Sequence, residues 1–135
     1  MKRSLIIIAT LILTSITAFA QKPKDGIEVL YFKANLSCCM ARSCNALEAD
    51  VQKVITTKYP KGDVLFTEVK LEEAANEALV KKYNAKSQTV IVVKTKRGKQ
   101  SFKDISSVTR DYLRSQDYAA FEKAMCAHIE EIKKK

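Results

Sequence analysis

The hydrophobic and polar positions of this chain follow two periods. Short apolar runs rich in β-branched and aromatic residues predict strands, whereas apolar residues spaced three or four apart predict amphipathic helices. The predicted strands cover 27–32, 64–69, 89–93 and 100–103. The predicted helices cover 41–58, 71–83 and a segment that begins at Ser106 or Ser107 as its cap and runs to about residue 132, with a break near 115–116.

The predicted helices each carry one apolar stripe that requires a buried partner. The inward residues are Leu47, Val51, Val54 and Ile55 in the first helix, Leu71, Ala75, Ala78 and Leu79 in the second, and Phe121, Met125, Ile129 and Ile132 in the last. A tight turn at Lys96-Arg97-Gly98, with Gly98 at positive φ, makes the last two strands an antiparallel hairpin. The order β-α-β-α-β-β-α predicts an α/β domain with a central four-stranded mixed sheet and helices on both faces.

The first twenty residues differ from the rest and predict a secretory signal peptide. Lys2 and Arg3 precede an apolar run over 5–13, and Ala18-Phe19-Ala20 gives a small-x-small cleavage site. We therefore divide the chain into a signal peptide (1–20), a linker (21–26) and one domain (27–135), and expect an exported protein, periplasmic or extracellular. A retained N-terminal anchor is the alternative. The apolar run is short for a bilayer span, which takes about 20 residues, so no stable membrane insertion is expected after cleavage.

The chain is basic, with a formal net charge of +9 that falls to +7 when Lys2 and Arg3 leave with the signal. The basic residues are concentrated only at 94–99 and 133–135, and neither stretch has aromatic residues between its basic residues. Without such interleaving or a nucleic-acid motif, no nucleic-acid partner is expected. A solvated basic surface is the preferred interpretation, and attraction to anionic membranes or acidic partners is the alternative.

Three of the four cysteines lie within seven residues, in the stretch SCCMARSC over 37–44. Outside the cytosol disulfides form and persist, so these residues are candidates for redox chemistry or for crosslinks. A bridge that closes so short a loop removes little entropy from the unfolded chain and is a weak stabiliser. The stretch follows the first strand directly and leads into the first helix.

This order, with cysteines between the first strand and the first helix, resembles the thioredoxin superfamily over nearly the whole mature chain. The residues that carry the likeness are Tyr31-Phe32 at the end of the strand, the Cys44-x-x-Leu-Glu segment that ends at Glu48 and opens a helix, and the run over 83–93. The resemblance implies a redox site in the cysteine stretch, with protein thiols and disulfides as partners and no cofactor. The spacing differs from Cys-x-x-Cys, the chain has no tryptophan, and Thr89 takes the place of the family's cis-proline, so a trans bond is expected there.

The cysteine stretch suggests a specific exchange mechanism. Cys38 and Cys39 precede the predicted helix by one to three residues, where the helix N-terminus favours the thiolate, and Arg42 adds a positive charge. Either cysteine could attack a disulfide, with Cys44 resolving the mixed disulfide. We therefore predict catalytic roles for Cys38, Cys39 and Cys44, without choosing between the first two. Glu48 is a candidate proton relay, with an ordinary surface carboxylate as the alternative.

Two non-catalytic interpretations remain open for the same cysteines. In the first, the protein is a binding or structural module with static disulfides. One of Cys38 and Cys39 is then bridged to Cys44 and the other to Cys126. In the second, the cluster binds Cu(I) or zinc, with Cys126 and His128 completing the site. Cys126 is otherwise expected to be a half-buried, inert thiol and His128 a surface residue.

Overall fold

The computed structural model describes residues 24–35 and 39–135, with the side chains of residues 39–41 outside the description. The predicted signal peptide therefore lies outside the described residues. The elements in chain order are β1 (Gly26–Lys33), α1 (Cys39–Lys58), β2 (Val64–Lys70), the 3₁₀ turn η1 (Ala74–Asn76), α2 (Glu77–Tyr83), β3 (Val90–Lys96), β4 (Lys99–Asp104), α3 (Ser106–Ser115) and α4 (Tyr118–Lys134).

The four strands form one mixed sheet in the order β2-β1-β3-β4. β1 pairs in parallel with β2 across the α1 connection, and it pairs antiparallel with β3, which in turn pairs antiparallel with β4. The predicted α/β class and four-stranded mixed sheet are confirmed. β1 and β3 are central, which explains why each contains a continuous apolar run, over 29–32 and 90–93.

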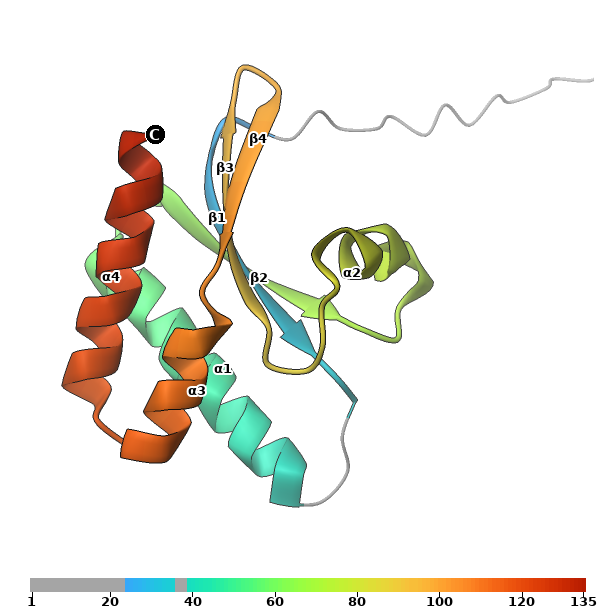
Figure 1. Ribbon diagram of the computed structural model, residues 1–135, viewed down its shortest axis with the longest axis vertical. Helices are drawn as coiled ribbons and strands as arrows, with labels where there is room; N and C mark the ends of the chain where they lie inside the picture. The colour runs from blue at the N-terminus through green and yellow to red at the C-terminus, as the bar shows by residue number, and fades with distance from the viewer. Residues whose placement is uncertain (1–23, 36–38) are drawn as a thin grey trace, which may run out of the picture.

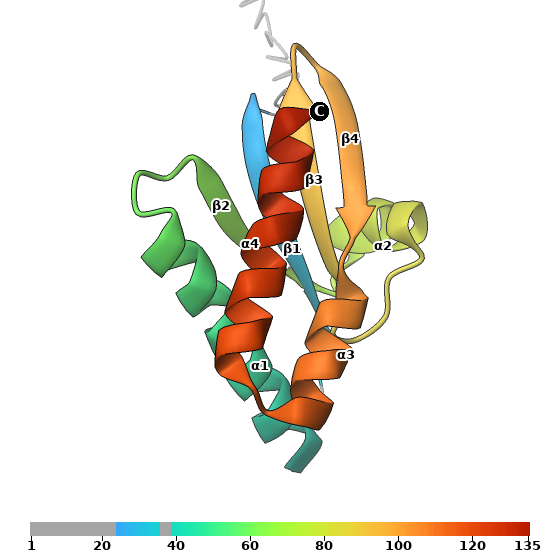
Figure 2. The same cartoon turned by 60° about the vertical axis from the view of Figure 1, so that its left-hand side comes forward.

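Helices cover both faces of the sheet. α1, α3 and α4 lie on one face, and α2 lies on the other (Figures 1 and 2). Because side chains alternate along a strand, β1 supplies both cores: Val29 and Tyr31 pack under the three helices, and Leu30 and Phe32 pack under α2. All four residues are at most 4% exposed.

The β3–β4 hairpin turns through two residues, as Lys96 pairs with Lys99. Arg97 has φ 51° and Gly98 has φ 77°. Two consecutive positive φ angles match the twist of antiparallel strands, so the predicted role of Gly98 is confirmed.

The second predicted helix is wrong in its length and in part of its buried face, since Leu71 and Leu79 pack against the core as predicted. A 3₁₀ turn precedes α2, and Ala75 and Ala78 are exposed, while Leu79 and Val80 pack against the core. The Asn76 side chain donates a hydrogen bond of 2.9 Å to the carbonyl of Lys70. This side-chain bond favours a turn over a continuous helix, which shifts the later helical register.

The C-terminal segment contains two helices, as the predicted break implied. Gln116 adopts φ 57° and ends α3, and the carboxylate of Asp117 caps α4 by accepting from the N–H of Ala120 at 3.0 Å. The predicted serine cap is wrong, because Ser106 is the first residue of α3. Its N–H and hydroxyl both donate to Asp104, at 2.8 and 2.6 Å. Among the described residues, no helix combines the length and apolar character needed to cross a bilayer.

Candidate functional site

Two of the three clustered cysteines, Cys39 and Cys44, lie in the first two turns of α1. Cys38 lies outside the described residues, whereas Cys39 is the first residue of α1. The helix begins two residues earlier than predicted, so Cys39 is inside the helix and Cys44 is in its second turn. The apolar stripe of α1 starts only at Leu47, which is why periodicity gave no signal for the first turns.

Cys44 is buried, with 3% of its surface exposed, and its sulfur faces the loop before β3. The Nε2 of Gln88 donates to Cys44 Sγ at 3.2 Å, and the hydroxyl of Ser87 lies 3.9 Å from the same sulfur. A thiolate at this position would keep the amide donor. Sequence reasoning missed both Ser87 and Gln88, although they directly precede Thr89, the position that resembles the family's cis-proline.

The loop that carries Gln88 is fixed to the end of β1. The N–H of Gln88 donates to the carbonyl of Phe32 at 2.8 Å, and the N–H of Phe32 donates to the carbonyl of Thr89 at 2.9 Å. Gln88 has φ 68°, a conformation that costs a residue with a side chain about 1 kcal/mol or more. All peptide bonds in the described residues are trans, including the one before Thr89, as expected.

Tyr31 supports Cys44 from the floor of the site. Its hydroxyl donates to the Cys44 carbonyl at 3.1 Å, and its side chain is fully buried. Burial, followed by the nearby charges of Cys44, Glu48 and Glu68, raises the pKa of Tyr31. The phenol therefore stays neutral and acts as a fixed donor.

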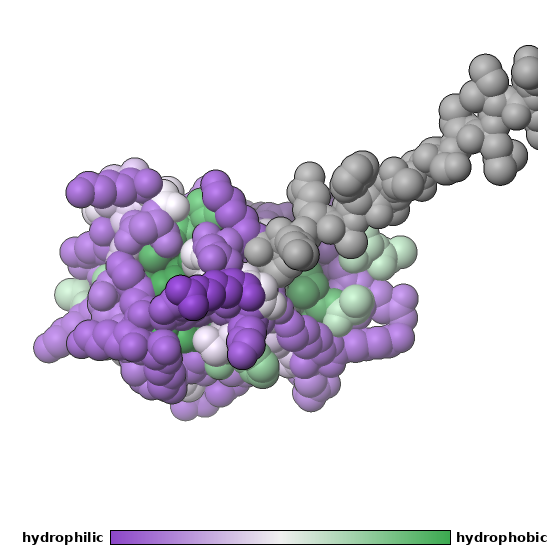
Figure 3. Space-filling view, turned by 90° about the horizontal axis from the view of Figure 1, so that it is seen from above, coloured by the Kyte–Doolittle hydropathy of each residue, from purple (hydrophilic) through white to green (hydrophobic). Residues whose placement is uncertain are grey.

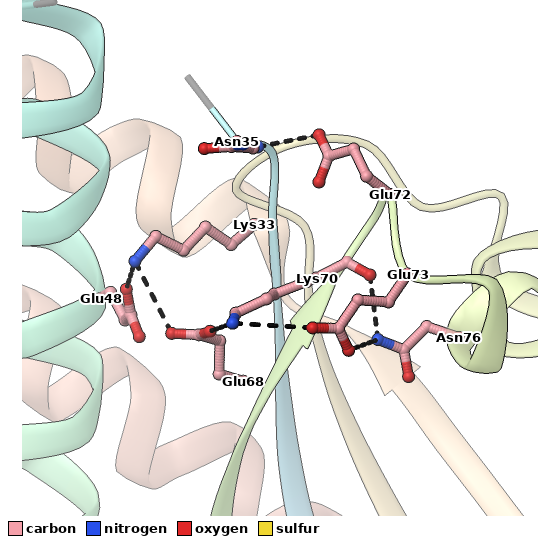
Figure 4. A network of polar contacts seen from close by, with 8 residues as sticks. All are labelled: Lys33, Asn35, Glu48, Glu68, Lys70, Glu72, Glu73 and Asn76. Atoms are coloured by element: carbon pink, nitrogen blue, oxygen red, sulfur yellow. Dashed lines mark hydrogen bonds and ion pairs between the residues drawn. The ribbon is translucent and has the colours of Figure 1, made fainter. Parts of the chain in front are cut away.

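A charged network adjoins the site one helical turn beyond Cys44 (Figure 4). Lys33 Nζ lies 2.6 Å from Glu48 Oε2 and 3.6 Å from a carboxylate oxygen of Glu68. The side chain of Glu48 is only 15% exposed, so it is not an ordinary surface carboxylate.

The two carboxyl groups of this network titrate in opposite directions. Burial, then the hydrogen bond with Glu68, raises the pKa of Glu48, although Lys33 opposes the shift. The hydrogen bond with Glu48 lowers the pKa of Glu68. We assign the shared proton to Glu48, because it is the more buried of the two carboxyls and a proton between two adjacent carboxylates relieves their repulsion.

A cavity of about 470 Å³ opens beside Cys44 at the carboxyl ends of β1 and β2. Its walls are held by polar contacts, since the N–H of Asn35 donates to Glu72 at 2.8 Å and Lys70 lies 3.6 Å from Glu73 (Figure 4). The lining residues are Lys33, Ala34, Asn35, Cys44, Asn45, Lys70, Glu72 and Glu73. Cys44, although only 3% exposed, is therefore one of the residues in the wall of a polar cavity.

The first turn of α1 contains no acidic residue, and Arg42 is exposed there. Helix N-termini favour polar or negative side chains, which bond their free N–H groups and complement the positive end of the dipole. None of residues 39–42 carries a carboxyl group, so the first turn would favour an anion such as a cysteine thiolate.

Cys126 lies far from the cluster. It packs in α4 beside Tyr59, which follows the last residue of α1, and the nearby charge of Cys126 contributes, after burial, to the raised pKa of Tyr59. Because α1 rises about 1.5 Å per residue, its end lies about 20 Å from Cys44. A disulfide requires Cα atoms within about 6.8 Å, so a bridge from Cys126 to Cys44 or Cys39 does not fit this structure.

Within the described residues, Cys126 and His128 are not assembled with Cys44 into the suggested metal site. Cys126 is a free, half-buried thiol, as expected, and the ring of His128 lies 3.7 Å from Glu131 on the surface of α4. Within the part of the chain that the structure describes, no three Cys, His, Asp or Glu side chains are grouped to hold a metal ion.

Comparisons with known proteins give little information about identity. No protein-family model matches the sequence, and no curated protein is similar to it. A solved structure described as that of a malarial protein is 26% identical and covers 73% of this chain and 97% of its own, with a TM-score of 0.43. That description specifies no activity.

Proposed function

We propose that this protein is a thioredoxin-like domain that exchanges thiols and disulfides, or senses their redox state, through Cys38, Cys39 and Cys44. One observation carries the proposal: Cys44 is buried at the carboxyl end of β1, bonded to Gln88 Nε2 at 3.2 Å, in the wall of a cavity. An inert structural cysteine usually lies in an apolar core without a polar donor. The element order and the mixed sheet are compatible with this family assignment.

The attacking group is a thiolate at the start of α1. Cys39 is at the first helical position, where free N–H groups and the helix dipole favour an anion. Arg42 strengthens the local positive potential. Cys39 therefore lies closer to the positive end of the helix dipole than Cys44, which lies in the second turn.

Helix geometry limits how Cys39 can form a disulfide with Cys44. Residues five apart in an α-helix have Cα atoms about 8.7 Å apart, from a radius of about 2.3 Å, a rise of about 1.5 Å and about 100° per residue. That separation exceeds the limit of about 6.8 Å for a disulfide. A Cys39–Cys44 bridge therefore requires the first turn of α1 to open.

The exchange is a two-step transfer of two electrons. The thiolate of Cys38 or Cys39 attacks one sulfur of a substrate disulfide, forms a mixed disulfide and releases the other sulfur as a thiolate. The Cys44 thiol then loses its proton, and its thiolate attacks the cysteine of the mixed disulfide and releases the second substrate thiolate. The substrate disulfide is reduced, and the two cysteines of this chain become a disulfide. A partner protein with a dithiol then reduces that disulfide and regenerates the two cysteines.

Glu48 is placed to accept the proton that Cys44 loses. The two residues are one turn apart on the same face of α1, where Cβ atoms lie about 5–6 Å apart. In its ionised form, Glu48 is a stronger base than an exposed glutamate, because its pKa is raised. Glu68 and Lys33 keep its carboxyl group in place.

The biological setting follows from the sequence. We infer that the protein is exported, to a periplasmic or extracellular space, and acts on protein thiols or disulfides there. Such compartments contain the disulfides that the chemistry needs.

Insulin reduction with dithiothreitol as the electron source tests the proposal. The chain from residue 21 should accelerate the precipitation of reduced insulin, and Cys44→Ser should abolish turnover. Cys126→Ser is the matched control and should keep the wild-type rate, because Cys126 is about 20 Å away. Equal rates for the wild type and Cys44→Ser, or a cluster bridge that glutathione cannot reduce, would contradict the exchange function.

A further inference from the structure

The end of the molecule opposite the cysteines is strongly basic. Five cationic side chains, with two neutral ones and no acidic side chain, line a cavity of about 370 Å³ between the β3–β4 turn and the C-terminus: Lys94, Lys96, Arg97, Lys99 and Lys135, with Gln100 and Ser101. Figure 3 shows this end, where hydrophilic side chains dominate the surface. Side chains from a turn and from a helix end thus converge on one positive surface, which we name the basic end.

Most of this charge is not neutralised within the described residues. Lys96, Arg97 and Lys99 are exposed and their side chains form no ion pair in the described part of the chain. Lys94 donates to the carbonyl of Lys133 at 2.7 Å, and Lys135 lies 3.4 Å from Glu131. The positive charge remains available to an external anion.

The path of the chain indicates what this anion is. The carboxylate of Asp25 accepts from the N–H of Arg97 at 2.9 Å, which places the start of the described chain at the basic end. Lys24 and the 23 residues before it, including the apolar run over 5–13, therefore join the domain on this side. While the predicted signal peptide is still attached, the chain presents this end to the membrane that it crosses.

We propose that the basic end docks on an anionic phospholipid surface. The cationic side chains contact lipid phosphates, as juxtamembrane basic clusters do. The basic end and the cysteine site lie at opposite ends of β1, about 23 Å apart for its eight residues. Docking in this orientation leaves Cys44 and its cavity facing away from the membrane, accessible to protein partners.

Co-sedimentation with vesicles tests this docking for the chain from residue 21, which contains all described elements. Vesicles of phosphatidylcholine with phosphatidylglycerol should bind the protein at low salt, whereas phosphatidylcholine alone should not. Each lysine near an anionic surface strengthens binding about fivefold, so the triple variant Lys96→Gln, Lys99→Gln, Lys135→Gln should bind about 100-fold more weakly.

A second triple variant controls for net charge. Arg110→Gln, Arg114→Gln and Lys123→Gln remove the same charge from exposed positions on α3 and α4, and should weaken binding less than about threefold. Equal weakening by the two variants would overturn the docking surface. Absence of binding to phosphatidylglycerol, or equal binding to an acidic polypeptide such as polyglutamate, would overturn the choice of a membrane.

Discussion

Formation of a Cys39–Cys44 disulfide should unwind the first turn of α1. In Cys38→Ser only Cys39 remains in the cluster to bridge Cys44. The two Cα atoms must approach by about 2 Å, from about 8.7 Å to at most about 6.8 Å. An intact helix cannot provide this movement.

The cost follows from the hydrogen bonds that are lost. In an α-helix the N–H groups of Ser43 and Cys44 bond to the carbonyls of Cys39 and Met40. Losing both at about 1 kcal/mol each costs about 2 kcal/mol. For a two-electron couple this makes the bridge about 40 mV easier to reduce than a bridge that leaves the helix intact.

Amide hydrogen exchange by NMR measures the effect directly. In oxidised Cys38→Ser the amides of Ser43 and Cys44 should exchange much faster than in the reduced protein. Val51 and Val54, deeper in α1, should keep their protection in both states. The helical argument is refuted if mass spectrometry shows the Cys39–Cys44 bridge while both amides at the start of α1 stay protected.

Three further predictions concern the surroundings of the site and the core. Gln88→Ala should slow resolution of a mixed disulfide, measured by stopped flow, about tenfold, because a hydrogen bond to an ionised sulfur is lost. Gln116→Ala, also at positive φ but at the end of α3, should leave this rate unchanged. Equal rates for the two variants would argue against the Gln88 contact. Ser106→Ala should lower the free energy of unfolding in urea by about 1–3 kcal/mol, because a buried N–H of β3 loses its acceptor, whereas exposed Ser107→Ala should stay within about 0.5 kcal/mol. Burial raises the pKa of Glu48, so the folded state favours its protonated form. The free energy of unfolding of the wild type should therefore fall relative to that of Glu48→Gln as the pH rises from about 4 through the shifted pKa. A rise instead would mean that the attraction of Lys33 dominates.

The sequence predicted the sheet well because its signals are local. Apolar runs identify the central strands β1 and β3, and Gly98 marks the hairpin turn whatever packs around it. The stripe from Phe121 to Ile132 is equally direct, since all four of its inward residues are buried in α4.

The surroundings of Cys44 could not be predicted in the same way. Gln88 lies 44 positions away and reaches the sulfur only because the chain pairs β1 with β3, so no local pattern reveals the contact. The start of α1 was also missed, because its first turns carry no apolar stripe. Likewise, the sequence pattern around Glu48 is that of a surface carboxylate, because Lys33 and Glu68 come near it only in the folded chain.

Trapping of a mixed disulfide tests the central claim most directly. Cys44→Ser would be incubated with insulin without reductant, quenched with an alkylating agent and digested for mass spectrometry. The account predicts a stable disulfide between an insulin chain and Cys38 or Cys39, with Cys126 alkylated as a free thiol. The absence of any insulin adduct on Cys38 and Cys39 would contradict the proposed exchange chemistry.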